Sequence, residues 1–427
     1  MNKIRKIIKK ILIQSDAKHI AMLSSGVLIG QIILLVVQPV TTRLYSPEAF
    51  GCLSLVVSLG TMFSPVATLQ YNISIVHSPN KDEYPLCKLV LLCITVTTAI
   101  LLFVLGFLLL FGDEEYKNLG AWIFVAAIIH FMTGISSLVD SYNNRHSEYS
   151  LMTKVTVQRA VFSGIVKIGL GFLKCGFPGL LISQCVGIIA GIRKQASSMI
   201  RYMKEIVHAK KRDVLNVAVK YRDQPLFALP GVFVLQFSYS ALPLIINTVF
   251  SATEGGYFSL TINVLGLPLT LVSNNVARVF FKNASEEMER SRNFKSTFRT
   301  TSILLIVTSV IGFSLLWFIA EPLFSIVFGK EWIYSGIYTK MLIPMYSARF
   351  VVSGLMHGFV ISKKQKIKTV LQSLFIAVMI VGYFIAELGI VTIEGFLIYI
   401  NWMYFMLYVM IFAVLWTQSK KIVKVEK

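Results

Sequence analysis

Long apolar segments alternate with short polar loops along nearly the whole chain. Each apolar segment is about 20 residues long, which is the length that a helix needs to cross the hydrocarbon core of a bilayer. The pattern therefore predicts twelve membrane-spanning helices, at about residues 19–40, 49–70, 88–111, 119–141, 151–173, 179–200, 225–248, 257–280, 299–320, 337–361, 370–390 and 395–416.

Composition agrees with this pattern. Of the 427 residues, 55% are hydrophobic and 15% are charged, whereas a soluble domain holds about 25% charged residues. Mean hydropathy is +0.70. We therefore predict an all-α polytopic membrane protein. The five cysteines are odd in number and form no CxxC pair, so the sequence indicates neither a disulfide framework nor a metal site, and we expect no cofactor.

The net charge of +20 follows the loops. Every second loop, counted from the N-terminal tail, is basic, and these loops hold 33 of the 41 Lys and Arg. This asymmetry is the positive-inside rule, so we expect both termini in the cytoplasm and no nucleic-acid partner. The basic loops are 1–18, 71–88, 142–154, 193–224, 278–299, 362–369 and 417–427, with 6, 2, 2, 9, 6, 4 and 4 Lys and Arg.

Residues 2–14 place isoleucine and leucine on one helical face and lysine and arginine on the other. This pattern predicts an interfacial helix that lies on anionic membrane lipids. Its simplest role is to anchor the topology.

One turn occurs twice in the chain. "TTRLYSPEAFGCLSL" joins spans one and two, and "NTVFSATEGGYFSL" joins spans seven and eight. Gly51 and Gly256 are 205 residues apart, and Pro65 and Pro268, in the helices that follow, are 203 apart. The nearly constant offset indicates a duplicated six-helix unit.

Two sets of six spans flank the longest basic loop. Because six crossings return the chain to the same side, the halves are expected to be parallel repeats, with substrate between them. We therefore predict an N-terminal lobe over 1–192, a basic cytoplasmic linker over 193–224 and a C-terminal lobe over 225–427.

Three basic residues lie within predicted spans: Arg159 and Lys167 in span five, and Arg349 in span ten. A charge at the bilayer centre costs about 2.5–3.5 kcal/mol on insertion scales, so it needs a partner or a wet cavity. On a helix, Arg159, Lys167 and Lys174 fall within an arc of roughly 80° over roughly 22 Å and form a basic stripe.

Two interpretations of these cations stay open. They could line a substrate cavity shared by the two lobes, or they could snorkel or pair with carboxylates. Only Asp140 and Glu387 are acidic residues within spans, both near span ends, so we expect no central acidic partner. An anionic substrate would then supply the counter-charge. Asn275 and Arg278, at the predicted cytoplasmic end of span eight, could contact substrate or cap the helix.

Four segments in order resemble the polysaccharide flippases of the multidrug/oligosaccharidyl-lipid/polysaccharide exporter superfamily. They are "TTRLYSPEAFG", "ATLQYNISIV", "KYRDQP" and "GLPLTLVSNNVARVFFKNASE". The positions that match the family pattern are Arg43, Tyr221, Arg222, Asp223 and Pro225.

This resemblance implies a V-shaped, twelve-helix architecture with a cationic central cavity and no catalytic residue. It implies a flippase that moves undecaprenyl-diphosphate-linked oligosaccharide units, such as O-antigen units, across the bacterial inner membrane. The implied partners are this lipid-linked glycan, membrane lipids, a polysaccharide polymerase and a chain-length regulator. Arg43 joins Arg159, Lys167, Lys174, Arg349, Asn275 and Arg278 as a candidate substrate-binding residue.

Three other functions compete with this interpretation. A polymerase or ligase of the same pathway usually exposes a sizeable outer domain or a DxD-type metal site, whereas the longest outer loop here has about 16 residues and no DxD occurs. A multidrug antiporter of the same superfamily would want a carboxylate in mid-membrane. A major-facilitator transporter would carry a glycine- and arginine-rich loop after span two. The segment at this place here, "VHSPNKDEYP", contains neither glycine nor arginine.

The topology is testable by labelling. Cysteines placed at Asp113 and at Lys211 should react with an impermeant thiol reagent from opposite faces of the membrane, because an odd number of predicted spans separates them. Labelling from the same side would contradict both the span count and the repeat.

Overall fold

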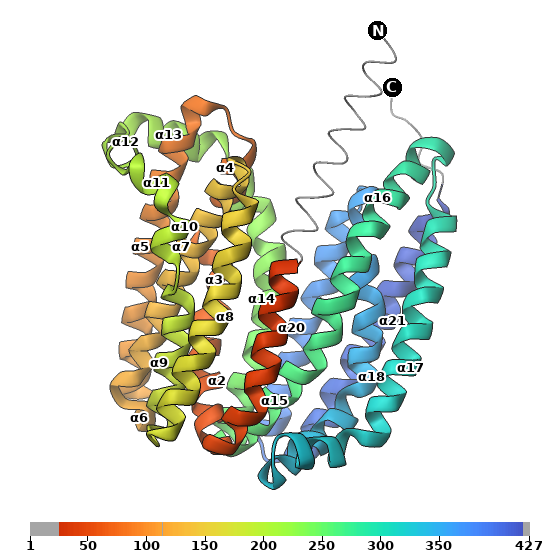
Figure 1. Ribbon diagram of the computed structural model, residues 1–427. Coiled ribbons are helices and arrows are strands. Elements are labelled where there is room, and N and C mark those ends of the chain that lie inside the picture. Colours follow the sequence, from red (N-terminus) through yellow and green to blue (C-terminus); the bar gives the residue numbers. More distant parts are fainter. Residues whose placement is uncertain (1–24, 113, 422–427) are drawn as a thin grey trace. The chain divides into compact units, whose positions relative to one another are not determined.

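The computed structural model describes residues 25–112 and 114–421, and within them every regular element is a helix (Figure 1). The predicted interfacial helix over 2–14 and the labelling position Asp113 lie outside the described residues. The all-α prediction is confirmed.

The described helices include three π-helical turns (η2, η3 and η4) and two 3₁₀ turns (η1 and η5). In chain order they are Ser25–Leu44, α2 (Pro47–Met62), α3 (Ser64–Ala67), α4 (Tyr71–His77), α5 (Asn80–Phe111), α6 (Glu114–Leu119), η1 (Gly120–Phe124), α7 (Val125–Arg145), α8 (Tyr149–Phe172), α9 (Gly176–Ile189), α10 (Ile192–Gln195), α11 (Ser197–Arg201), α12 (Met203–His208), α13 (Lys211–Lys220), η2 (Gln224–Ala228), α14 (Leu229–Ile245), η3 (Ile246–Phe250), α15 (Ala252–Pro268), η4 (Leu269–Ser273), α16 (Asn274–Ser291), α17 (Lys295–Val327), η5 (Lys330–Trp332), α18 (Ile333–Leu355), α19 (Gly358–Ile361), α20 (Gln365–Glu387) and α21 (Ile393–Lys420).

Eleven helical segments within the described residues are long and apolar enough to cross a membrane. Helix α18 supplies the twelfth predicted span: it has 23 residues but also carries Lys340 and Arg349, which lower its hydropathy. It packs against α15, α16, α17 and α21, so protein rather than lipid surrounds much of it. A helix shielded in this way can hold polar side chains that lipid would not tolerate.

The chain divides into two compact units. Unit 1 comprises Met1–Leu44 and Phe63–Leu229, and unit 2 comprises Tyr45–Met62 and Pro230–Lys427. The division near Leu229 lies close to the predicted start of the C-terminal lobe at residue 225. Helix α2, which sequence alone assigns to the N-terminal lobe, packs against α15 and belongs to unit 2.

In unit 1, the basic linker is folded onto the helix ends. Helices α12 and α13 pack on α5, and Lys88 of α5 donates hydrogen bonds to the carbonyls of Val207 and Ala209, both at 2.7 Å. Asn143 of α7 donates to the Gln195 carbonyl at 2.9 Å. Three loops predicted to be cytoplasmic, 71–88, 142–154 and 193–224, therefore meet at one end of this unit. That this end faces the cytoplasm stays a prediction.

In unit 2, hydroxyl groups of neighbouring helices hold the backbone of α18. Thr261 donates to the Ser335 carbonyl at 2.9 Å, Ser273 to that of Phe350 at 2.7 Å, and Ser309 to that of Ser347 at 3.1 Å. Short side chains that bond across helices allow close packing where no water competes. Helix α18 is thereby fixed from several sides.

The two copies of the repeated turn meet inside unit 2. A Cβ on Gly51 would lie 1.7 Å from the Ala252 carbonyl oxygen, and a Cβ on Gly256 would lie 1.8 Å from the Pro47 carbonyl oxygen. Pro47 and Ala252 are also 205 residues apart and so hold equivalent positions in the two turns. Gly51 of the first turn therefore contacts Ala252 of the second, and Gly256 of the second contacts Pro47 of the first. The two contacts are thus reciprocal, as contacts across a local two-fold axis between the two turns are.

We expect Gly51→Ala and Gly256→Ala each to destabilise the protein by about 1–3 kcal/mol, because a methyl group at either site would overlap a backbone carbonyl that cannot rotate away. Thermal unfolding in detergent measures the effect. Gly106→Ala in α5 and Gly312→Ala in α17 are matched controls, since nothing lies within 4 Å of their added methyl groups. Wild-type melting of both Gly51→Ala and Gly256→Ala would contradict the close contact.

Candidate functional site

Arg349, on the buried helix α18, is fixed by aromatic rings. Its guanidinium carbon lies 3.9 Å from the ring centroid of Tyr239 on α14 and 5.4 Å from that of Tyr346. Within residues 25–112 and 114–421, no carboxylate lies within 4.0 Å of this guanidinium. Arginine stacked on tyrosine is held by a cation–π interaction that leaves its positive charge uncompensated.

Arg349 lines a cavity of about 350 Å³ within unit 2. This volume lies in the range of small-molecule sites. Arg349 is the one charged residue among the described residues of the wall, which are Tyr239, Leu242, Phe258, Ile262, Asn263, Gly266, Leu269, Thr270, Asn274, Leu342, Met345, Tyr346, Arg349, Ser353 and Ile400. The wall thus combines one cation with amide, hydroxyl and aromatic groups.

Irregular helical turns shape this cavity. After Pro268, the helix widens into the π-helical turn η4, which contributes Leu269 and Thr270 to the wall. Such π turns are frequent at functional sites. Pro344 lies inside the continuous helix α18, and the Asn401 side chain of α21 accepts a hydrogen bond from the Met345 amide at 2.9 Å. The amide that follows the proline therefore keeps a partner at this depth.

Arg159, on α8 in unit 1, lies in a hydrogen-bond network. It donates to the Gln195 side chain at 2.9 Å, to Ser136 at 3.3 Å and to the Ala190 carbonyl at 3.4 Å. The amide of Gln195 in turn donates a hydrogen bond to the Asp140 carboxylate. Gln195 thus links a cation on α8 to an anion on α7.

The expectation that the central cations lack acidic partners is wrong for Arg159. Asp140 interacts electrostatically with Arg159, and α7 and α8 pack against each other. Sequence reasoning placed Asp140 near a span end, but the turn at residues 146–148 brings the two helices antiparallel and within reach. Lys167, two turns farther along α8, is partly buried.

The predicted basic stripe ends before Lys174. Helix α8 ends at Phe172, and Lys174 lies beyond it in an exposed turn with a left-handed backbone, φ +53°. Helical spacing therefore does not extend to this residue. Arg43 is also exposed and donates to the Pro39 carbonyl of its own helix at 3.0 Å.

Asn275 and Arg278 lie in the first turns of α16, which continues directly from η4 and leaves no free helix end there, so the helix-capping interpretation is wrong. They belong to one long helical segment, Ala252–Ser291, which runs well beyond the predicted end at 280. Asn275 donates to the Leu271 carbonyl one turn earlier at 2.8 Å, and Arg278 is exposed. The neighbouring Asn274, which is not among the predicted site residues, lines the Arg349 cavity.

The candidate residues therefore divide between the units. Arg43, Arg159, Lys167 and Lys174 belong to unit 1, whereas Asn275, Arg278 and Arg349 belong to unit 2. That Arg159 and Lys167 share a cavity with Arg349 stays a prediction.

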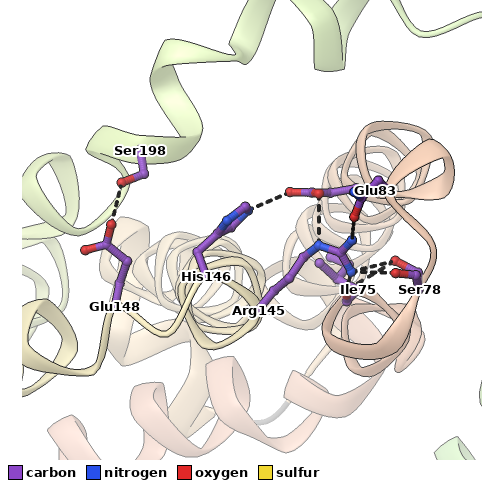
Figure 2. Close-up of polar contacts among 8 residues, drawn as sticks. Ile75, Ser78, Glu83, Arg145, His146, Glu148 and Ser198 are labelled. Carbon is purple, nitrogen blue, oxygen red and sulfur yellow. Dashed lines mark hydrogen bonds and ion pairs between the residues drawn. The ribbon is translucent and has the colours of Figure 1, made fainter.

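Sequence reasoning missed a polar cluster at the loop end of unit 1, shown in Figure 2. Arg145 donates to Glu83 at 2.9 Å, to the Ile75 and Ser78 carbonyls at 2.8 and 2.7 Å, and to Asn80 at 2.7 Å. His146 contacts the second oxygen of Glu83 at 2.8 Å. The cluster joins the end of α7 to the last turn of α4, to Ser78 and to the first turn of α5. The only sequence signal was a pair of acidic residues, Asp82 and Glu83, in a basic loop.

Asp82, the neighbour of Glu83, anchors the end of the linker. It accepts hydrogen bonds from Lys220 and from the Tyr221 hydroxyl, the latter at 2.9 Å. The hydrogen bonds to Asp82 and Tyr221 raise the pKa of the Lys220 amine. The motif positions around Tyr221 therefore fix the linker to unit 1.

No group of three or more His, Cys, Asp or Glu side chains that could hold a metal ion occurs in the described ranges.

Comparison with solved structures defines the class of the fold. An inward-facing multidrug resistance transporter of the MATE family, in the MOP superfamily, has a TM-score of 0.66 at 12% identity, covering 91% of this chain and 94% of the other. The lipid II flippase MurJ, in an inward closed conformation, has 0.64 at 12% identity, covering 92% and 87%. A mutant of the Vibrio cholerae MATE transporter VcmN has 0.55 at 14% identity, covering 95% and 97%.

The fold is therefore that of the MOP-superfamily transporters, two lobes with about twelve membrane helices. Residues 40–337 match the family described as polysaccharide biosynthesis protein, and the chain belongs to that family. The resemblance drawn from the sequence motifs is confirmed. No curated protein matches the chain in sequence.

We expect Arg145→Ala to destabilise the protein by about 3–5 kcal/mol, because it leaves the buried Glu83 carboxylate and two carbonyls without their donor. Lys117→Ala is the matched control: its pair with Glu114 is exposed, with 43% and 81% of the side chains accessible, and should contribute less than about 1 kcal/mol. Thermal unfolding in detergent compares the two. Equal melting temperatures would show that the cluster does not hold unit 1 together.

Proposed function

We propose that the protein is a flippase that moves polyprenyl-diphosphate-linked oligosaccharide units, destined for a surface polysaccharide, across the bacterial inner membrane. Membership of the polysaccharide biosynthesis family and the transporter fold support the general class. The observation that carries the more specific proposal is the charge of Arg349 within a membrane helix, which no carboxylate of the described residues balances. Arg349 has no carboxylate partner in the described residues, and unit 1 holds Arg159 and Lys167 on one helix, with Asp140 near Arg159.

The uncompensated charge of Arg349, and the two cations that α8 holds in unit 1, favour an anionic cargo. A buried charge is costly until a counter-ion arrives, and arginine binds phosphate and carboxylate groups through paired N–H donors. The lipid diphosphate is an anion common to every substrate of this class. We propose that Arg159 and Lys167 contribute to holding it while the polyprenyl tail stays in the bilayer.

The glycan itself also needs a polar route. Each hydroxyl buried without a hydrogen-bond partner costs about 1–3 kcal/mol, so a bare oligosaccharide cannot cross hydrocarbon. Amide and hydroxyl side chains such as Asn263, Asn274 and Thr270 supply such partners. Transport rather than catalysis is thus the chemistry that we assign to these helices.

The multidrug antiporter is the alternative within the same fold. A cationic drug would need an acidic group at its site, and in the part of the chain that the structure describes no Asp or Glu lines the Arg349 cavity. The cavity chemistry therefore favours the anionic, lipid-linked cargo.

We expect Arg159→Ala with Lys167→Ala to abolish surface polysaccharide and to accumulate lipid-linked units on the cytoplasmic leaflet, because the cargo diphosphate loses its counter-charge. Arg159→Lys, which keeps a point charge, should retain partial export. Immunoblotting of surface polysaccharide in the native bacterium, together with membrane levels of each variant, measures the effect.

Asp140 provides the control for a purely structural effect. Removing Arg159 leaves the Asp140 carboxylate uncompensated, and adding Asp140→Asn removes that charge. We expect the added change to restore protein levels but not export. Normal export by the Arg159→Ala, Lys167→Ala variant would refute the mechanism.

A further inference from the structure

We propose that the Arg349 cavity of unit 2 binds a carboxylate-bearing sugar of the transported glycan, and that the lipid diphosphate binds elsewhere. The inference rests on the proposed function and specifies the substrate class: an oligosaccharide that contains an acidic sugar.

Charge balance is the first argument. Arg349 supplies one positive charge, and no other described residue of the wall is charged. A single carboxylate neutralises it. A diphosphate diester carries two negative charges, so at least one would stay uncompensated in a cavity surrounded by membrane helices, at a high energetic cost.

The geometry of the guanidinium is the second argument. Tyr239, 3.9 Å from the guanidinium carbon, covers one face of Arg349 and fixes its plane. The N–H groups at the edge of a fixed guanidinium match the two oxygens of a planar carboxylate. A preoriented arginine loses little side-chain entropy when the anion binds.

The remaining polar groups fit the rest of a sugar ring. Asn263, Asn274, Thr270 and Ser353 line the same cavity and offer amide and hydroxyl groups to ring hydroxyls. A site that hydrogen-bonds hydroxyls while pairing one charge discriminates strongly against ligands that lack either. The volume of about 350 Å³ suits a compact polar ligand, whereas a polyprenyl chain would need a far larger apolar groove.

The test is thermal unfolding of the purified full chain in detergent with sodium glucuronate, glucose or sodium pyrophosphate, at matched sodium concentration. We expect glucuronate near saturation to raise the Tm by about 2 °C or more, because it binds only the folded state. Glucose should give no shift. The glucuronate shift should disappear in Arg349→Gln and be reduced in Arg349→Lys, which keeps the charge but not the paired donors.

Lys340→Gln is the matched control. Lys340 lies on the same helix, pairs with Glu321 at 2.6 Å and does not line the cavity, so its loss should leave the glucuronate response unchanged. If Arg349→Gln does not fold, the comparison uses Arg349→Lys and Lys340→Gln. A glucuronate shift in Tm that is reduced in Arg349→Lys but not in Lys340→Gln comes from the cavity, whereas a shift reduced equally in both does not.

Three outcomes would overturn the inference. The first is a rise in Tm with pyrophosphate but not with glucuronate, which disappears in Arg349→Gln. This result would assign the cavity to the diphosphate and would leave the proposed function unchanged. Equal shifts with glucose and glucuronate would remove the role of the carboxylate. No shift with any of the three would also overturn it, whereas export in cells decides the proposed function separately.

Discussion

A cation in a membrane protein needs a counter-charge or another stabilising partner. The partners of the cations named below explain which of the charges are structural and which can bind a ligand. Arg145 is bound to Glu83, Lys220 to Asp82 and Lys340 to Glu321. Arg159 reaches Asp140 through Gln195. Arg349 instead lies against tyrosine rings beside a polar cavity. In the part of the chain that the structure describes, carboxylates account for these other cations but not for Arg349, so the charge of Arg349 is available to a ligand.

The same helices explain how the fold can hold such a residue. Helix α18 is packed among protein helices, its carbonyls accept hydrogen bonds from hydroxyl groups of α15, η4 and α17, and Asn401 satisfies the amide that follows Pro344. Elsewhere in unit 2 the reciprocal contact of Gly51 and Gly256 packs two backbones together. Rigid packing around a polar cavity preorganises the site, so that the ligand does not have to order it.

The sequence was sufficient for the features that depend on local composition. Apolar length predicted the spans, and the offset of 205 between Gly51 and Gly256 singled out two similar turns that the structure places in direct contact. It also singled out Arg349. It could not predict the features that depend on which helices become neighbours: the link from Arg159 to Asp140, the continuation of α16 past residue 280, or the transfer of α2 to unit 2. Asn274 was missed as a lining residue because the π turn η4, which directly precedes it and shifts the helical spacing, has no clear sequence signature.

The most direct test of the central claim, that the membrane helices carry an anionic lipid-linked glycan, is translocation by the purified protein. Proteoliposomes would be loaded with a fluorescent polyprenyl-diphosphate oligosaccharide, and its arrival in the outer leaflet followed with a membrane-impermeant, glycan-cleaving enzyme. If the helices carry this cargo, exposure of the glycan depends on the protein, and the same vesicles take up no cationic dye. Movement of the cationic dye without movement of the glycan would contradict it.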